Sequence, residues 1–147
     1  MFKKILCAVD GSEHSLRSVE VASEMAEKFG APLTILTVAK SVKLPAKVRE
    51  FFQSESLMGE ATYVLEPMTE SVLAEAKKRA EAKGSVKVDT VVLQGQPART
   101  IVDFVKRNKI DCAVIGSRGL GDLEAALLGS VSHKVTSLAD CTVVVVK

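Results

Sequence analysis

Residues 5–30 have the sequence ILCAVDGSEHSLRSVEVASEMAEKFG. The run Ile5–Val9 is apolar without alternation, which is typical of a parallel strand that helices cover on both faces. Ser12 is a good helix N-cap, and Gly30 followed by Pro32 marks the end of the helix. Between these two signals the apolar residues recur at helical spacing: Leu16, Val19, Ala22, Ala26 and Phe29. The stretch therefore predicts a buried strand followed by an amphipathic helix.

The same alternation of strand and helix continues through the rest of the chain. Further strands are predicted over residues 33–38, 88–93, 112–115 and 142–146. Further helices are predicted from about Thr69 to Lys83, from Pro97, and over residues 130–138. Right-handed crossovers then give an α/β fold, a single-domain open parallel five-stranded sheet with helices on both faces, like a Rossmann fold. This pattern leaves two strand orders open, 3-2-1-4-5 and the flavodoxin-like 2-1-3-4-5.

The segment between the second and third strands is longer than a usual connection. Residues 41–64 are interpreted as a variable insertion within one domain of residues 1–147. Residues 47–53 are compatible with a turn or two of helix, and Gly59 and Pro67 are expected to interrupt anything longer.

Composition narrows the class of protein. The 147 residues suffice for one domain, and 47% hydrophobic with 26% charged residues is globular rather than disordered. A net charge of +2, no Trp and one Tyr argue against a nucleic-acid partner. No apolar run is long enough for a signal peptide or a membrane span, so a cytoplasmic location without membrane insertion is expected. The three cysteines lack zinc-site spacing and are expected to be buried apolar residues, and His14 and His133 to be surface residues.

A glycine-rich stretch follows the fourth predicted strand. Gly116 ends that strand, where a side chain would keep a ligand from the backbone, and Gly119 lets the loop turn back. After nine further residues, Gly129 and Ser130 open the last helix. The start of a helix offers unpaired amide groups and the positive end of the dipole, which together favour a phosphate group. The stretch therefore predicts a phosphate-binding loop at the carboxyl end of the sheet, with Arg118 directed either at phosphate or at solvent.

The pattern Gly-x-x-Gly, nine residues, Gly-Ser resembles the ATP-binding motif of the universal stress protein family and matches it without a gap. The similarity extends to the first strand and turn over residues 5–15, to the turn at Gly95-Gln96-Pro97-Ala98, and to the last strand. It covers nearly the whole chain and is weakest over residues 41–64. By this resemblance the chain is identified as a member of the ATP-binding branch of the family.

The resemblance implies the strand order 3-2-1-4-5, with ATP and Mg²⁺ held between the ends of strands one and four. Asp10 would lie near the ribose and phosphates and contact the Mg²⁺, although the local sequence fits a helix-entry residue beside the Ser12 cap equally well. Val38 would meet the adenine through its backbone, and Gln94 would line the same rim. The other residues expected to bind the nucleotide lie in the glycine motif: Gly116, Ser117, Arg118, Gly119, Gly129, Ser130 and Val131.

The function expected from the resemblance is that of a nucleotide-dependent regulatory or stress-response protein with an unidentified regulatory partner. A slow ATPase or phosphotransferase is one alternative, since only Asp10 and Arg118 are available for phosphoryl transfer. A nucleotide-free dimeric scaffold is another. The strand Thr142–Val146 is expected at a sheet edge, where an antiparallel copy would cover it in a homodimer, as is common in the family.

Overall fold

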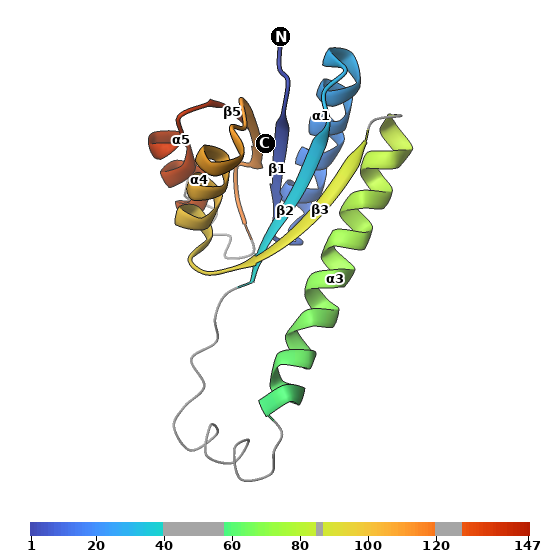
Figure 1. Cartoon of the computed structure of the whole chain (residues 1–147), viewed down its shortest axis with the longest axis vertical. Coiled ribbons are helices and arrows are strands. Elements are labelled where there is room, and N and C mark those ends of the chain that lie inside the picture. Colours follow the sequence, from blue (N-terminus) through green and yellow to red (C-terminus); the bar gives the residue numbers. More distant parts are fainter. Residues whose placement is uncertain (40–57, 85–86, 120–127) are drawn as a thin grey trace.

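The computed structural model describes residues 1–39, 58–84, 87–119 and 128–147. Five parallel strands form one sheet in the order β3-β2-β1-β4-β5, which confirms the 3-2-1-4-5 order and excludes the flavodoxin-like one. The strands are β1 (Ile5–Val9), β2 (Leu33–Ala39), β3 (Val88–Gln94), β4 (Cys112–Gly116) and β5 (Thr142–Val146). The helices are α1 (Glu13–Phe29), α3 (Met58–Lys83), α4 (Pro97–Asn108) and α5 (Ser130–Leu138). Helices α1 and α3 cover one face of the sheet, and α4 and α5 cover the other (Figure 1).

Helix α1 begins and ends where the sequence predicts. The Ser12 side chain caps its first turn by accepting a 3.2 Å hydrogen bond from the Ser15 amide. Gly30 ends the helix in the left-handed conformation, with φ 63°, which glycine adopts without steric cost. In the middle of α1 the buried hydroxyl of Ser23 donates a 2.7 Å hydrogen bond to the Ala80 carbonyl of α3. Small residues on this face of α1 therefore allow close packing against α3.

Each face of the sheet has its own core, because successive side chains of a strand point to opposite faces. Ile5, Cys7 and Val9 of β1 pack with α1 and α3, whereas Leu6 packs with α4 and α5. The central strands β1 and β4 are buried over nearly their whole length. Full burial of one such side chain contributes ~1.5–3 kcal/mol, so the two cores are the main force that holds the helices on the sheet.

The cysteines belong to these cores, as the sequence predicts. Cys7 and Cys112 are buried, Cys141 is half-buried, and all three are free thiols. Burial raises the pKa of the Cys7 thiol to about 12 and the pKa of the Cys112 thiol to about 11. At neutral pH both thiols therefore stay protonated and unreactive.

Helix α3 differs from the sequence prediction at its start. It begins at Met58 rather than near Thr69, and it continues through Gly59 and Pro67. A proline removes one amide donor and disfavours a helix interior by ~3 kcal/mol, so the helix passes Pro67 against the local preference on which the prediction relied. Of the predicted insertion over residues 41–64, the part up to residue 57 lies outside the described residues, including the possible turn at 47–53. The rest belongs to α3.

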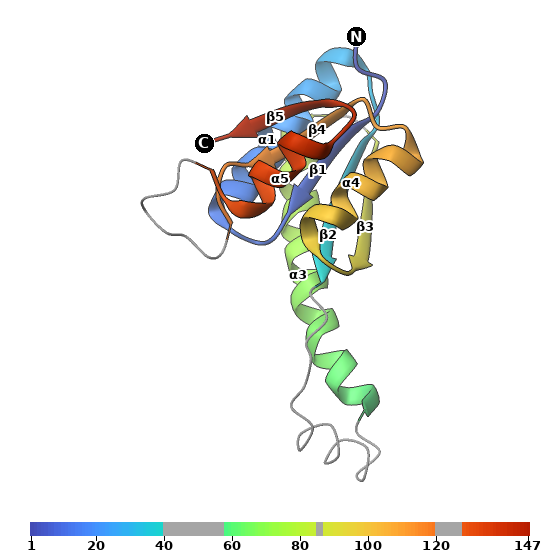
Figure 2. The same cartoon turned by 90° about the vertical axis from the view of Figure 1, so that its left-hand side faces the viewer.

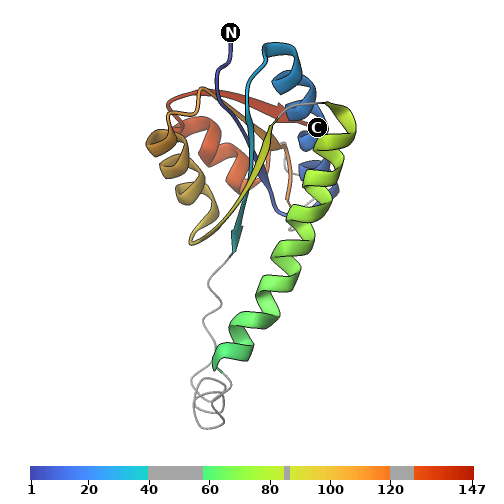
Figure 3. The same ribbon diagram turned by 45° about the vertical axis from the view of Figure 1, so that its right-hand side comes forward.

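The amino-terminal part of α3 projects beyond the carboxyl ends of the strands. Figures 1 and 3 show the helix running along the sheet and continuing past the tip of β2, and Figure 2 shows the same projection from the side. Although α3 has 26 residues, no helix in the described part of the chain is both long and apolar enough to cross a membrane.

Candidate functional site

The carboxyl ends of β1 and β4 lie side by side, because these two strands pair directly. Ala8 pairs with Ile115, so Asp10 follows β1 where Gly116 and Ser117 end β4. The chain leaves β1 toward α1 on one face and leaves β4 toward α5 on the other face (Figure 1). In open α/β sheets this reversal is the position at which ligands bind.

Asp10 reaches across this position to the glycine loop. A Cβ atom placed on Gly119 would lie 2.6 Å from Asp10 Oδ2, so a side chain there would displace the carboxylate. The other carboxylate oxygen, Oδ1, accepts a 2.9 Å hydrogen bond from the Ser12 amide. Asp10 is therefore a helix-entry residue that also lies beside the loop, and its contact with a nucleotide stays a prediction.

Two hydroxyl groups hold the peptide group that joins Val9 to Asp10. Thr37 Oγ1 donates a 2.8 Å hydrogen bond to the Val9 carbonyl, and the Asp10 amide donates a 3.3 Å hydrogen bond to Ser15 Oγ. Both Thr37 and Ser15 are buried. Neither residue was predicted from the sequence. A polar residue near the end of an otherwise apolar strand, as Thr37 is in β2, was the available signal.

Gly116 lies against the first turn of α1. A Cβ atom there would lie 2.9 Å from the carbonyl carbon of His14 and 3.0 Å from the Ser15 amide nitrogen. These are backbone atoms of the first turn of α1, which cannot move aside as a flexible side chain can. The glycine thus allows α1 to approach the end of β4, and its contact with a ligand stays a prediction.

The two halves of the glycine motif meet in space. The Gly129 amide donates a 2.7 Å hydrogen bond to the Ser117 carbonyl, and the Ser117 amide donates a 2.7 Å hydrogen bond to the Val146 carbonyl of β5. A Cβ atom on Gly129 would lie 3.4 Å from the Arg118 Cα and 3.7 Å from the Gly119 nitrogen. Residues 117–119 and the start of α5 therefore form one layer at the carboxyl edge, while residues 120–127 lie outside the described part.

The amino terminus of α5 faces this layer. Gly129 is its N-cap residue and provides no side-chain hydrogen bond to the first turn, in contrast to Ser12 at α1. Ser130 is exposed and Val131 is half-buried. The buried Ser132 hydroxyl donates a 2.7 Å hydrogen bond to the Gly116 carbonyl and so ties α5 to the end of β4. The first amides of α5 are thus presented without a side-chain cap, which suits an anion.

Val38 and Gln94, the remaining predicted residues, lie at the same carboxyl edge of the sheet. They are progressively further from the layer formed by residues 117–119 and the start of α5. Thr37 pairs with Val9, so the next residue of β2, Val38, is level with Asp10 across the sheet. Val38 is half-buried against the α4 side of the core. Gln94 is exposed at the end of β3, one strand further out. Val38 therefore belongs to the edge of the site, whereas Gln94 is peripheral.

The two histidines differ from each other. His133 is exposed on α5, as predicted. His14 is only half-exposed, and its Nδ1 atom is buried without a hydrogen-bond partner in the described structure. His14 is therefore only partly a surface residue. Its Nδ1 side is buried where the first turn of α1 packs against the end of β4.

Metal ligands do not cluster in the described ranges. Across residues 1–39, 58–84, 87–119 and 128–147, no three His, Cys, Asp or Glu side chains gather to form a metal site. Asp10 alone could therefore contribute only part of a coordination sphere.

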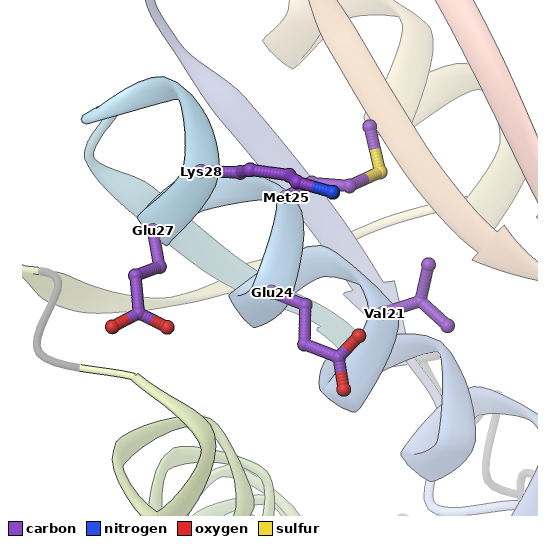
Figure 4. Close-up of a pocket in the computed structure, with 5 residues that line it drawn as sticks. All are labelled: Val21, Glu24, Met25, Glu27 and Lys28. Atoms are coloured by element: carbon purple, nitrogen blue, oxygen red, sulfur yellow. The ribbon is translucent and has the colours of Figure 1, made fainter.

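A shallow hollow lies elsewhere, along the outer side of α1 (Figure 4). Glu27 extends toward α3, and Met25 and Val21 point the other way. Glu24 forms an ion pair of 3.9 Å with Lys83 of α3. None of the predicted site residues lines this hollow, which belongs to the packing of α1 against its neighbours.

The sequence and the structure of this chain were each compared with known proteins, and both comparisons point to one family. The model of the universal stress protein family matches residues 1–147. The chain is 34% identical over 149 residues to universal stress protein YxiE of Bacillus subtilis, with full coverage of both chains. The solved structure of the hypothetical protein MJ0577 is similar with a TM-score of 0.82 at 27% identity, covering 100% of this chain and 96% of that one. A universal stress protein in complex with cAMP is similar with a TM-score of 0.71 at 27% identity, covering 99% and 97%. The chain belongs to the universal stress protein family.

Proposed function

We propose that the protein binds ATP with Mg²⁺ between the carboxyl ends of β1 and β4, and that the bound nucleotide controls a regulatory interaction. The observation that carries the proposal is the approach of Asp10 to Gly119, where a Cβ atom would lie 2.6 Å from the carboxylate. This approach places a carboxylate beside a glycine loop that continues into an uncapped helix start.

The phosphates would lie at the first turn of α5. Backbone amides of Ser130 and Val131 and the exposed Ser130 hydroxyl would donate to phosphate oxygens. The positive end of the α5 dipole adds a favourable interaction with negative charge. Gly119 and Gly129, both without side chains, would let the nucleotide approach the backbone.

Mg²⁺ fits such a site as a bridge between phosphate and protein. The ion usually binds one or two carboxylates together with phosphate oxygens and water, and it does not need a cage of protein ligands. Asp10 is exposed, and its Oδ2 faces the loop, so it would supply the carboxylate. When bound, the ion would neutralise part of the phosphate charge.

The base would lie toward Val38, which is level with Asp10 on the neighbouring strand. The related universal stress protein in complex with cAMP supports an adenine nucleotide as the ligand class. The complete glycine motif, which resembles that of the ATP-binding branch, favours ATP among adenine nucleotides.

A regulatory role fits the site better than efficient catalysis. Phosphoryl transfer requires metal-binding carboxylates and a positioned base or cation. In the layer formed by residues 117–119 and the start of α5, the described side chains offer Asp10 as a carboxylate and Arg118 as a cation. We therefore expect at most a slow ATPase.

A homodimer through β5 is part of the same proposal. Strand β5 pairs with β4 on one side, and no other described strand pairs with it. An open edge of valines favours association, and a second copy in antiparallel pairing would cover it. Sedimentation equilibrium should give the mass of two chains, and a monomer at micromolar concentration would contradict the dimer.

The test of ATP binding begins with the purified protein. After denaturation, released nucleotide is identified by chromatography and mass spectrometry, and nucleotide-free protein is titrated with Mg·ATP by calorimetry. We expect about one ATP per chain, with binding lost in Gly119→Val and weakened in Ser130→Ala. The matched control is His133→Ala, an exposed residue of the same helix. A wild-type protein that neither carries nor binds ATP would leave the dimeric scaffold as the better account.

A further inference from the structure

Helix α3 packs directly against the turn that carries Asp10. Gly11, the next residue, has φ 87°, a conformation that favours glycine. A Cβ atom on Gly11 would lie 2.9 Å from Cγ2 of Val72, a residue in the middle of α3. The turn between β1 and α1 is therefore held between the glycine loop, which Asp10 meets, and α3, which Gly11 meets.

A second set of contacts joins α3 to the first half of α1. Arg79 Nη1 lies 3.4 Å from Glu13 Oε1 and 4.0 Å from Glu20 Oε1, while Arg79 Nε donates a 2.9 Å hydrogen bond to Glu75 within α3. Glu13 is the first residue of α1, directly after the Ser12 cap. Arg79 lies about two helical turns after Val72 and contacts the same part of α1.

The length and stiffness of α3 allow it to transmit a movement of that turn to a region beyond the sheet. A helix of 26 residues is ~39 Å long and stiff, and Val72 lies near its middle. The half before Val72 extends past the carboxyl ends of the strands (Figures 1 and 3). A small change in the turn at Gly11 would therefore change the direction of a projecting segment.

We propose that α3 senses occupancy of the site: the contact between Val72 and Gly11, together with the ion pairs of Arg79, couples the position of α3 to the nucleotide beside Asp10. The proposal rests on the proposed function, since it requires nucleotide at Asp10. The coupling is reciprocal. If the nucleotide shifts the position of α3 by some factor, a change that shifts the position of α3 changes the nucleotide affinity by the same factor. The projecting half of α3 is then the part of the molecule that differs between the ATP-bound and nucleotide-free forms.

The test combines hydrogen exchange with nucleotide titration. In the wild-type protein, Mg·ATP should slow amide exchange at residues 116–119 and 129–131, and also in α3 around Val72. Val72→Ala and Arg79→Met should weaken ATP binding by at least about fivefold and remove the slowing in α3. The matched control is Lys83→Met, which breaks the ion pair between α3 and α1 at Glu24, at the far end of both helices. It should bind ATP within about twofold of wild type.

A double-variant experiment separates coupling from simple loss of stability. Gly11→Ala introduces the methyl group that meets Val72, and it should weaken ATP binding strongly. Combining it with Val72→Ala makes room for that methyl group but leaves the backbone strain at φ 87°, so the double variant should recover part of the affinity that Gly11→Ala loses.

Slowed exchange in the glycine loop with none in α3 would overturn the proposal and leave ATP binding intact. Wild-type affinity in Val72→Ala, or no recovery in the double variant, would overturn it as well. A protein that shows no slowing anywhere and binds no ATP contradicts the proposed function itself, and with it this coupling.

Discussion

Thr37 donates a 2.8 Å hydrogen bond from its hydroxyl to the carbonyl oxygen of Val9, the residue directly before Asp10. Thr37 and Val9 are only 6% and 5% exposed, so water cannot replace the bond. The bond joins β2 to the end of β1 on the side of α1 and α3, and it fixes the direction in which the chain leaves β1. The position of the Asp10 carboxylate thus depends on a residue of the neighbouring strand.

Replacing Thr37 by valine tests this dependence. Thr37→Val keeps the volume but removes the hydroxyl, so we expect a loss of ~1–3 kcal/mol in the free energy of unfolding and weaker ATP binding. Thr37→Ser keeps the hydroxyl and should lie between Thr37→Val and wild type. Urea denaturation and ATP titration of the three proteins provide the measurement, and equal stability of the Val and Ser variants would contradict the role given to the hydrogen bond.

A methyl group at Gly119 should displace the Asp10 carboxylate. Its Cβ atom would lie 2.6 Å from Asp10 Oδ2, so Gly119→Ala should weaken ATP binding by about tenfold, which corresponds to ~1.4 kcal/mol. The free energy of unfolding should change less, because Asp10 is exposed and its side chain can rotate.

The matched control for this variant is Gly84→Ala, at the other end of the molecule. Its Cβ atom would approach the flexible carboxylate of Glu27 to 3.1 Å, which the side chain can avoid. Calorimetric titration should give wild-type affinity for Gly84→Ala. Equal affinities of the two alanine variants would show that the space at Gly119 is not needed.

Local signals made much of the fold predictable. The bounds of α1 follow from Ser12 and Gly30, which act within one turn of the helix ends. The start of α5 at Ser130 follows Gly129 in the same way. Strand order is a long-range property, and composition and periodicity left two orders open until the family resemblance was used. The start of α3 could not be predicted, because Gly59 and Pro67 locally disfavour a helix that the structure nevertheless continues through both positions.

The glycine loop of the candidate site could be predicted from the sequence. The residues that pack around the loop and hold it in place could be predicted less well. The glycine spacing identified the residues that meet beside Asp10, since the motif lies within one loop-to-helix unit. The packing of Gly116 against the first turn of α1 could not be predicted, because the backbone of His14 that borders it is about 100 positions away in sequence. Likewise, the contact between Gly11 and Val72 depends on how α3 lies on α1. Such requirements come from tertiary packing, which no local pattern encodes.

Removing the Ser132 hydroxyl should loosen α5 from β4. The hydroxyl is buried and donates a 2.7 Å hydrogen bond to the Gly116 carbonyl, so Ser132→Ala should cost ~1–3 kcal/mol in the free energy of unfolding. Ser137→Ala in the same helix removes a 2.9 Å hydrogen bond to the His133 carbonyl at an exposed position. This control should change stability by less than ~0.5 kcal/mol. Thermal unfolding that ranks the two variants in the opposite order would contradict the anchoring role of Ser132.

The buried Cys7 thiol should make the fold less stable at high pH. Its pKa is raised from an ordinary value of 9.0 to about 12, chiefly because burial disfavours the thiolate. Below pH 9 both the folded and unfolded chains keep the proton, so the thiol does not change stability there. Between pH 9 and pH 12 the unfolded chain releases the proton while the folded chain retains it, so the free energy of unfolding should fall by up to ~1.4 kcal/mol per pH unit.

Comparison of wild type with Cys7→Ala isolates this contribution, because every other side chain is common to both proteins and its effect cancels in the difference. Urea denaturation at pH 8.5 and pH 10.5 should show a steeper loss of stability for the wild type than for Cys7→Ala. The alanine variant starts from lower stability, since it removes a buried sulfur atom from the core under α1. If the two proteins lost stability in parallel over this range, the Cys7 thiol would have to reach solvent in the folded state, which its full burial in β1 does not allow.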